Sequence, residues 1–295
     1  MRYERAQPYN FMGIEEPLSS FEDSSALILP VPYDGTTTYI SGTRQGPRAI
    51  IEASRSLEFY DEEIGEEIVR YGIHTLPEVE PAAEGPRWMV ERVAGIVSEL
   101  SETGKLIVLL GGEHSITIGA VWGLCGRVKE LSVLQIDAHA DLRDEHQSSK
   151  FSHACVMRRV RERCRDVVQV AIRSLSAEEA EFIEREGLRD QVFFMDDISK
   201  NPSWIEEVIS RLGDAVYITI DLDGLDPSVM PAVGTPEPGG LGWRELLKLL
   251  REIAERKRVI GFDVVELSPI PGFAAPNVTA AKLTYKLIGY ILSRR

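Results

Sequence analysis

The sequence is poor in cysteine. Only three cysteines occur among 295 residues, Cys125, Cys155 and Cys164, and no two of them form a CxxC pair. An odd number of thiols without that spacing argues against a disulfide framework and indicates a reducing compartment. We therefore expect the three side chains to be packing residues, including Cys155 close to His153.

Targeting and membrane signals are also missing. The N-terminal stretch MRYERAQPYNFMGIEEP contains acids and no apolar core, unlike a secretory signal. No apolar run approaches the roughly 20 residues that cross a bilayer. These absences predict a cytoplasmic protein without a membrane partner.

Positive charge is scarce. Lysine and arginine number 33 against 47 aspartates and glutamates, which gives a formal net charge of -14. A general nucleic-acid binder needs a basic face to meet phosphates, so we expect no nucleic-acid partner. The acidity serves solubility first and is compatible with a small cationic substrate.

The chain does contain short apolar runs that alternate with helical patterns. Near-continuous apolar runs are typical of parallel strands covered on both faces. Helices are predicted over 46–57, 176–187, 243–257 and from Pro276, and Ser176 with Glu179 forms a capping-box pattern. The rhythm predicts one α/β domain over 1–295, with three α/β/α layers, a mostly parallel sheet and an irregular segment 1–24 packed on it. The expected strands are 26–31, 106–110, 131–136, 167–172, 192–195, 215–220 and 258–265.

Four of these runs end in ionisable residues. Active sites of such folds lie at the carboxyl ends of the strands. Side chains at alternate positions of a strand point to one face, so Asp137, His139 and Asp141 are expected to converge on one site. The four sets are Glu113 and His114; Asp137, His139 and Asp141; Asp221 and Asp223; Asp263 and Glu266.

Carboxylates collected in one cleft resist ionisation unless cations neutralise them. Four aspartates and two neutral imidazoles balance the charge of two divalent ions. A carboxylate-rich set without thiolates suits Mn²⁺ best, and Fe, Co, Ni or Zn could also bind. A single DxHxD motif could also be a structural salt-bridge cluster. Together with the DxD and GGEHS motifs at two other strand ends, it favours a metal site.

The motifs GGEHSIT, DAHADLRD, SHACVMRR, DLDGLDPS and ELSP, in this order, resemble those of the ureohydrolases, which include arginase and agmatinase. The resemblance implies the arginase fold and two Mn²⁺ ions per subunit. It also implies homo-oligomers, trimers or hexamers. One ion would be held by His114, Asp137, Asp141 and Asp221, and the other by His139, Asp137, Asp221 and Asp223.

The resemblance also implies catalytic roles. A hydroxide bridging the ions would attack the guanidinium carbon, and Asp141 would carry a proton to the leaving amine. Glu266 would receive the guanidinium group, and His153 would act as a proton shuttle. Ordinary explanations compete with two of these roles, since His153 could be a surface histidine and Glu266 a salt-bridge partner. We expect Asp226 to be a turn residue and Glu113 to be a supporting residue beside His114.

The loops choose the substrate. Arg143 and Ser174 stand where arginases recognise the amino-acid end of arginine, so both weaken the case for arginine. PYDGTTTYISGTRQGP, IRSLS and TPEPGGLGWRE resemble agmatinases, which predicts hydrolysis of agmatine to putrescine and urea. His153-Ala154-Cys155 departs from the agmatinase pattern and is compatible with relatives that hydrolyse longer agmatine derivatives, such as N1-aminopropylagmatine. The same motifs are also compatible with a guanidinobutyrase, an arginase or a catalytically dead metal-binding scaffold.

Overall fold

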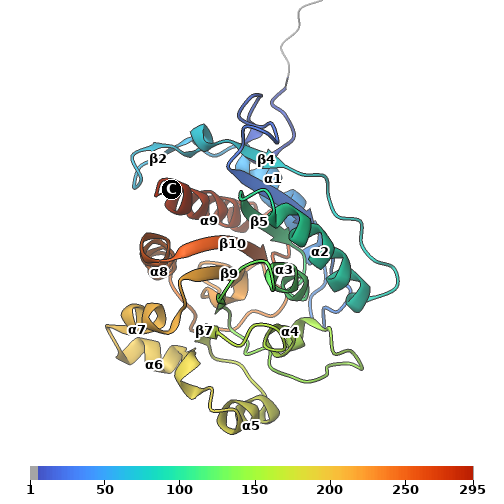
Figure 1. The fold of residues 1–295 in the computed structure, drawn as a ribbon, viewed down its shortest axis with the longest axis vertical. Helices are drawn as coiled ribbons and strands as arrows, with labels where there is room; N and C mark the ends of the chain where they lie inside the picture. The colour runs from blue at the N-terminus through green and yellow to red at the C-terminus, as the bar shows by residue number, and fades with distance from the viewer. Residues whose placement is uncertain (1–5, 295) are drawn as a thin grey trace, which may run out of the picture.

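An eight-stranded parallel sheet forms the centre of the computed structural model, which describes residues 6–294 (Figure 1). The strand order is β4-β1-β5-β10-β9-β6-β7-β8, so the strands that carry the charged motifs, β5, β6, β9 and β10, are neighbours in the middle of the sheet. The strands are β1 (Ala26–Val31), β4 (Ile73–Thr75), β5 (Leu106–Gly111), β6 (Leu131–Ile136), β7 (Val167–Ile172), β8 (Val192–Phe194), β9 (Ala215–Asp221) and β10 (Arg258–Val265).

Helices cover both faces of the sheet and form two separate apolar cores. In Figure 1, α8 and α9 lie on one side of the strands, and α2, α3 and α4 lie on the other. The three-layer α/β/α prediction is confirmed. The first core contains α1 (Gly46–Ser54), α6 (Met195–Lys200), α7 (Trp204–Arg211), α8 (Trp243–Arg256) and α9 (Ala275–Leu292); the second contains α2 (Pro86–Ser101), α3 (Ile116–Leu124), α4 (Val156–Val160) and α5 (Ala177–Arg185).

The sequence patterns located the long elements better than the short ones. All seven expected strands form, although the fifth ends at Phe194 and Met195 begins α6. The capping box of Ser176 and Glu179 begins α5 as predicted. Strand β4 was missed because its three residues lie in a segment that reads as a loop, and the hairpin of β2 (Tyr60–Asp61) and β3 (Glu66–Glu67) is equally short.

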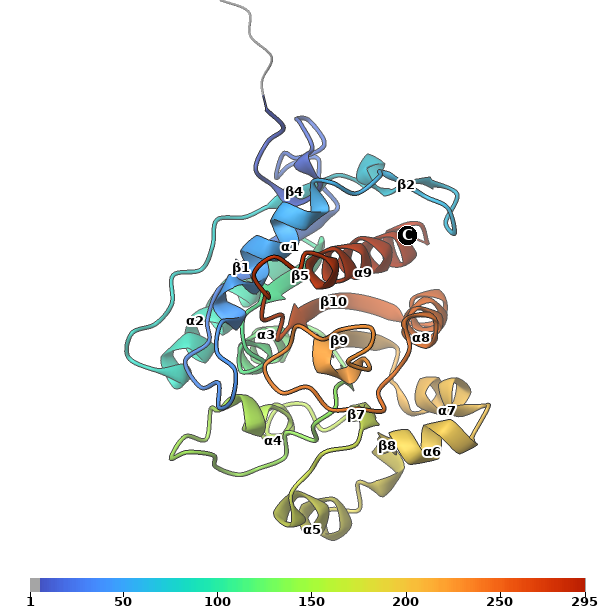
Figure 2. The ribbon, with the colours of Figure 1, turned by 180° about the vertical axis from the view of Figure 1, so that it is seen from behind.

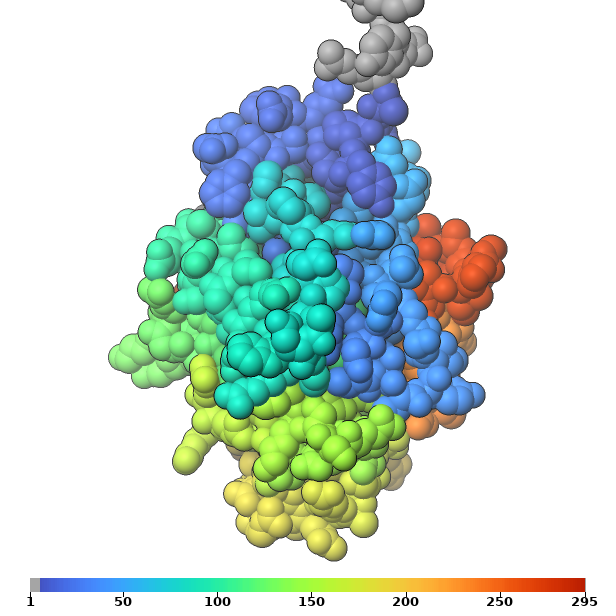
Figure 3. Space-filling view, turned by 90° about the vertical axis from the view of Figure 1, so that its right-hand side faces the viewer, coloured from blue at the N-terminus to red at the C-terminus, as the bar shows by residue number. Residues whose placement is uncertain are grey.

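The N-terminal segment packs on the domain through residues 11–14, which are buried. Residues 1–5 of the predicted segment 1–24 lie outside the described range. The short 3-10 helix η1 (Phe11–Gly13) is buried, and the backbone amide of Met12 donates to Ser54 Oγ at the end of α1 at 2.8 Å. Figure 3 shows the blue N-terminal segment beside the teal segment around α2.

Loops at the carboxyl ends of the strands build the site. In Figure 2 the orange loop that follows β9 curves around the end of that strand before α8 begins. Among residues 6–294, no helix is long and apolar enough to cross a membrane.

A buried ion pair ties the hairpin to the C-terminal helix. Lys286 of α9 is 3% exposed, and its Nζ lies 3.0 Å from Oδ2 of Asp61, a fully buried residue at the end of β2. Burial acts to raise the pKa of Asp61, but Lys286, the Ile64 amide and Lys282 outweigh it, so the pKa is lowered. Asp61 therefore stabilises the fold as a carboxylate.

We predict that Lys286→Met lowers the free energy of unfolding by about 3 kcal/mol, because it leaves a buried charge poorly compensated. The matched control Lys200→Met removes an exposed pair with Asp196 and should change it by no more than about 0.5 kcal/mol. Because the pKa of Asp61 is lowered by folding, its contribution is complete near neutral pH and declines below about pH 4. Urea titrations of the wild type and both variants across pH measure these free energies of unfolding. Equal free energies for Lys286→Met and Lys200→Met would contradict the prediction.

Candidate metal centre

The charged motifs meet at the carboxyl edge of the sheet, but not along extended strands. Strand β6 ends at Ile136, so Asp137, His139 and Asp141 lie in the turn that follows it. Asp141 has a φ of 53°, in the left-handed region. The predicted trio does not meet at one point: Asp137 and Asp141 lie together with His114, whereas His139 lies with Asp137 and Asp223. The strand periodicity offered as the reason for convergence was wrong, because the strand ends before the motif.

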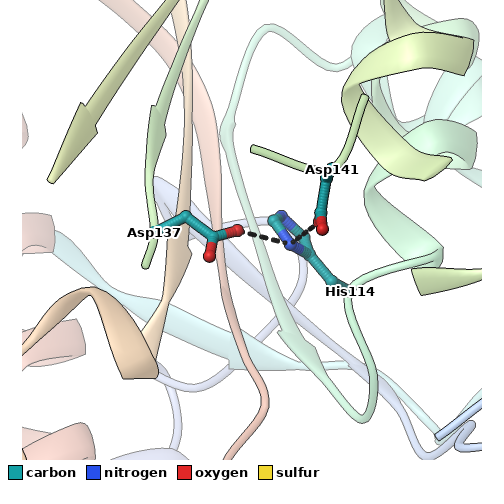
Figure 4. Close-up of side chains that lie close together, drawn as sticks. All are labelled: His114, Asp137 and Asp141. Carbon is teal, nitrogen blue, oxygen red and sulfur yellow. Dashed lines mark ion pairs between the residues drawn. The ribbon is translucent and has the colours of Figure 1, made fainter. Parts of the chain in front are cut away.

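A first cluster forms around one histidine nitrogen (Figure 4). His114 Nδ1 lies 3.1 Å from Asp137 Oδ2 and 3.0 Å from Asp141 Oδ2. Asp221 at the end of β9 places its Oδ2 3.4 Å from the same nitrogen. All four side chains are buried, so these atoms can hold one metal ion from several sides.

A second cluster uses the other oxygen of Asp137. His139 Nδ1 lies 3.0 Å from Asp223 Oδ2 and 3.6 Å from Asp137 Oδ1. Asp223 belongs to the short helix η6 (Leu222–Gly224), where a Cβ on Gly224 would lie 2.9 Å from Asp137 N. Only glycine allows the two turns to approach this closely. Asp137 is thus shared by both clusters, as a bridging ligand would be.

The hydrogen bonds of His114 test whether a cation fits. Thr219 Oγ1 donates to Asp263 Oδ1 at 2.6 Å and therefore accepts from His114 Nε2 at 2.9 Å. The neutral ring then carries its proton on Nε2, which leaves a lone pair on Nδ1. Among residues 6–294, that buried atom has no hydrogen-bond partner, although it faces three carboxylate oxygens. A divalent cation fits this arrangement, because it would accept the lone pair and neutralise the oxygens.

The carboxylates repel one another without a cation. Burial raises the pKa of Asp221 well above its usual range, and Asp223 and Asp137 raise it further. Burial and Asp137 likewise raise the pKa of Asp141 to about 6. Bound cations would reverse both effects, since an adjacent positive charge favours ionised carboxylates.

A pocket of about 250 Å³ opens above the clusters. Its wall contains His153 and Glu266, which lie 3.8 Å apart from Nδ1 to Oε1. Glu266 Oε1 also accepts from the His114 amide at 2.8 Å, and its φ of 66° turns the chain away from β10. Its described partners are a backbone amide and a histidine, not the arginine that a structural salt bridge would require.

Loop residues that the motifs did not indicate hold His153. Its backbone amide donates to Thr36 Oγ1 at 2.9 Å, and its Nε2 lies 3.4 Å from Thr38 Oγ1. The buried Glu113 accepts from the Thr36 amide and hydroxyl at 2.6 and 2.7 Å, which gives this residue the supporting part expected of it. Both threonines belong to the loop PYDGTTTYISGTRQGP, where nothing in residue type marks them as site residues.

Several other residues have ordinary roles. Asp226 accepts from the Ser228 and Gly239 amides and is a turn residue, as predicted. Asp263 lies inside β10, where it accepts hydrogen bonds, and it is not a pocket residue. Cys155 is buried, and burial raises the pKa of its thiol to about 12, as expected of a packing residue.

Comparison with known proteins agrees with this geometry. A sequence model described as the arginase family matches residues 24–289. The chain belongs to the arginase family. It is 42% identical to an N(1)-aminopropylagmatine ureohydrolase of Synechocystis, over 93% of this chain and 92% of the relative. It is 37% identical to an agmatinase of Pyrococcus horikoshii, over 95% and 97% of the two chains.

Solved structures give the same result. The agmatine ureohydrolase of Thermoplasma volcanium superposes with a TM-score of 0.86 at 32% identity, over 97% of this chain and 95% of that one. The predicted family and the arginase fold are therefore confirmed. This arginase-family protein is a ureohydrolase of the agmatinase type, and its two His/Asp clusters are able to hold metal.

We predict that Asp137→Ala abolishes metal binding at both clusters, because each loses one of its oxygens. Manganese measured by mass spectrometry after loading and desalting should fall to background, and urea release should fall more than about 10³-fold. Asp144→Asn, which alters a partly exposed ion pair with Arg159, is the matched control and should keep its metal. Wild-type manganese content in Asp137→Ala would contradict the assignment.

Proposed function

We propose that this arginase-family enzyme releases urea from a linear guanidine that carries a second cationic group, with N1-aminopropylagmatine as its preferred substrate and agmatine as the second candidate. The observation that carries the proposal is the pocket in which Glu266 and His153 stand beside two clusters of buried aspartate and histidine. An acidic cavity of this kind suits a cation.

The clusters would hold two divalent ions, Mn²⁺ by ligand preference, through His114, Asp137, His139, Asp141, Asp221 and Asp223. When bound, such ions supply Lewis acidity and a water activated for attack near neutral pH. Glu266 would accept hydrogen bonds from the guanidinium group as a charge-assisted pair and orient its carbon toward the clusters. The His114 amide already fixes Glu266 Oε1, so the carboxylate is held in place before the substrate arrives.

Proton transfer would involve Asp141 and His153. The amine must leave neutral, so a proton has to reach its nitrogen. Burial works against the charged form of His153, but Glu266, Asp141 and Glu113 outweigh this and raise its pKa. The ring lies on the wall of the pocket, with 14% of its side chain exposed, and can exchange protons with solvent as a shuttle must.

The outer pocket supports a substrate longer than agmatine. Glu179 lines it, but one oxygen accepts from the Leu142 amide at 2.9 Å and the other from the Ser176 amide at 2.7 Å and its hydroxyl at 2.8 Å. Arg143 adds a positive charge to the same wall. Among the described lining residues, no free carboxylate of the outer wall is therefore dedicated to a terminal ammonium group, and a longer chain can pass out to solvent.

Relatives add to this support. Proteins named N(1)-aminopropylagmatine ureohydrolase, from Synechocystis and Thermus thermophilus, are 42% and 39% identical to this chain, and the Pyrococcus agmatinase is 37% identical. The sequence-based expectation of agmatine stays open as the second candidate, and assembly into trimers or hexamers stays a prediction.

We predict that kcat/KM for N1-aminopropylagmatine exceeds that for agmatine by about tenfold, because the described residues of the outer wall offer no free carboxylate to the terminal ammonium of agmatine, whereas the longer chain carries its primary ammonium out to solvent. Arginine and 4-guanidinobutyrate should be poorer substrates of the Mn²⁺-loaded enzyme. A preference for agmatine would reverse the order of the two candidates. Absence of urea with all four compounds would overturn the proposal and favour a scaffold.

We predict that His153→Ala retains wild-type metal content but lowers kcat by about 10²-fold, because proton transfer becomes limiting. The control His74→Asn replaces a ring that lies outside the pocket and is bonded to the Ser19 carbonyl. It should leave kcat unchanged. A pH–rate profile of His153→Ala identical to that of the wild type would count against the shuttle role.

A further inference from the structure

Behind the metal centre, a pair of glutamine side chains spans two neighbouring strands. Gln135 of β6 and Gln169 of β7 are register partners in the sheet. Both are fully buried. Two uncharged amides at the centre of an apolar sheet need partners, because a buried polar group without one is destabilising.

The hydrogen bonds of the pair run in one direction. Gln169 Nε2 donates to the Ala140 carbonyl at 2.7 Å and to Gln135 Oε1 at 2.6 Å. A carbonyl can only accept, so the Gln169 amide nitrogen must face it. Gln169 Nε2 also donates to Gln135 Oε1, so this oxygen is an acceptor. The other end of the Gln135 amide, Nε2, therefore points toward Asp137 and donates to its Oδ2 at 2.6 Å.

This orientation leaves one atom unsatisfied. Gln169 Oε1 is buried and has no hydrogen-bond partner among the described residues. Such an atom is costly to keep in an apolar interior. It indicates that the position is used for the two donors that the amide provides, one to the Ala140 carbonyl in the DAHAD turn and one to Gln135, which in turn donates to Asp137.

We propose that Gln169 and Gln135 form a positioning relay that holds the metal ligand Asp137 and the turn between His139 and Asp141. The inference rests on the metal centre of the proposed function. Gln135 fixes Asp137 Oδ2, the oxygen that faces His114, and leaves Oδ1 to the second cluster. Gln169 holds the Ala140 carbonyl beside Asp141, whose left-handed backbone is otherwise unfavourable.

The relay therefore acts unequally on the two clusters. It should matter most for the ion held by His114, Asp137 and Asp141, since its short hydrogen bonds end at Asp137 Oδ2 and beside Asp141. Its contact with the second cluster is a longer one, 3.3 Å from Gln135 Nε2 to the His139 carbonyl. Supporting hydrogen bonds of this kind change metal affinity by about 10–100-fold.

The test compares Mn²⁺ binding by chelator-treated, full-length protein and three variants. Gln135→Met removes the donor at similar volume. Gln169→Glu keeps the shape but places an acceptor against the Ala140 carbonyl, which reverses or breaks the relay. Val133→Ala is the matched control for simple disruption of the strand. It creates a cavity on the same face of β6, two residues before Gln135.

Calorimetric titration should show two Mn²⁺ ions per wild-type chain. In both glutamine variants, we expect one of the two dissociation constants to rise about 10–100-fold while the other changes little. At half-saturating Mn²⁺, electron paramagnetic resonance should show more isolated and less coupled Mn²⁺ in these variants than in the wild type. Val133→Ala should lower the melting temperature yet keep wild-type affinities and spectrum.

Wild-type affinities in the folded glutamine variants would overturn the relay, as would an equal loss in Val133→Ala. If one glutamine variant does not fold, the other decides; if neither folds at 25 °C, the pair is a folding element and the relay is again overturned. Absence of Mn²⁺ binding by the wild type would instead show that the metal centre itself, and with it the proposed function, is wrong.

Discussion

The structure depends on the burial of mutually repelling carboxylates at the centre of one sheet edge. Asp137, Asp141, Asp221 and Asp223 are at most 7% exposed and lie around two histidine nitrogens. Burial and mutual repulsion raise the pKa of Asp141, Asp221 and Asp223, whereas at Asp137 the two histidines outweigh burial and lower the pKa. Bound cations would remove the remaining repulsion, and the family to which the chain belongs is metal-dependent.

The surrounding fold positions the side chains at this edge of the sheet. Parallel strands bring the ends of β5, β6 and β9 together, and the two apolar cores hold those strands rigidly from both faces. Hydrogen bonds behind the ligands fix their directions, from Asp263 through Thr219 to His114 on one side. On another side, Arg173 donates to the carbonyls of Asp223 and Glu237 and so fastens the loop after β9.

Residue type and order were enough to predict the long strands, the layers and the charged side chains that gather at the sheet edge. Spacing was a weaker guide, because Asp141 reaches its cluster through a left-handed turn rather than strand alternation. The residues that support the clustered side chains could not be predicted from the sequence. Thr36 and Gln169 have side chains that occur anywhere in a protein, and their importance comes from contacts with residues far away in the sequence. Asp263 shows the converse, since a charged residue near a strand end proved to be an internal hydrogen-bond acceptor.

The most direct test of the account is anomalous X-ray scattering at the manganese edge from crystals of the Mn²⁺-loaded protein. We predict two peaks about 3.5–4 Å apart, one on each side of Asp137, with His114 and His139 as ligands of different ions. A single peak, or two peaks that do not share Asp137, would contradict the central claim that one buried carboxylate joins two metal sites.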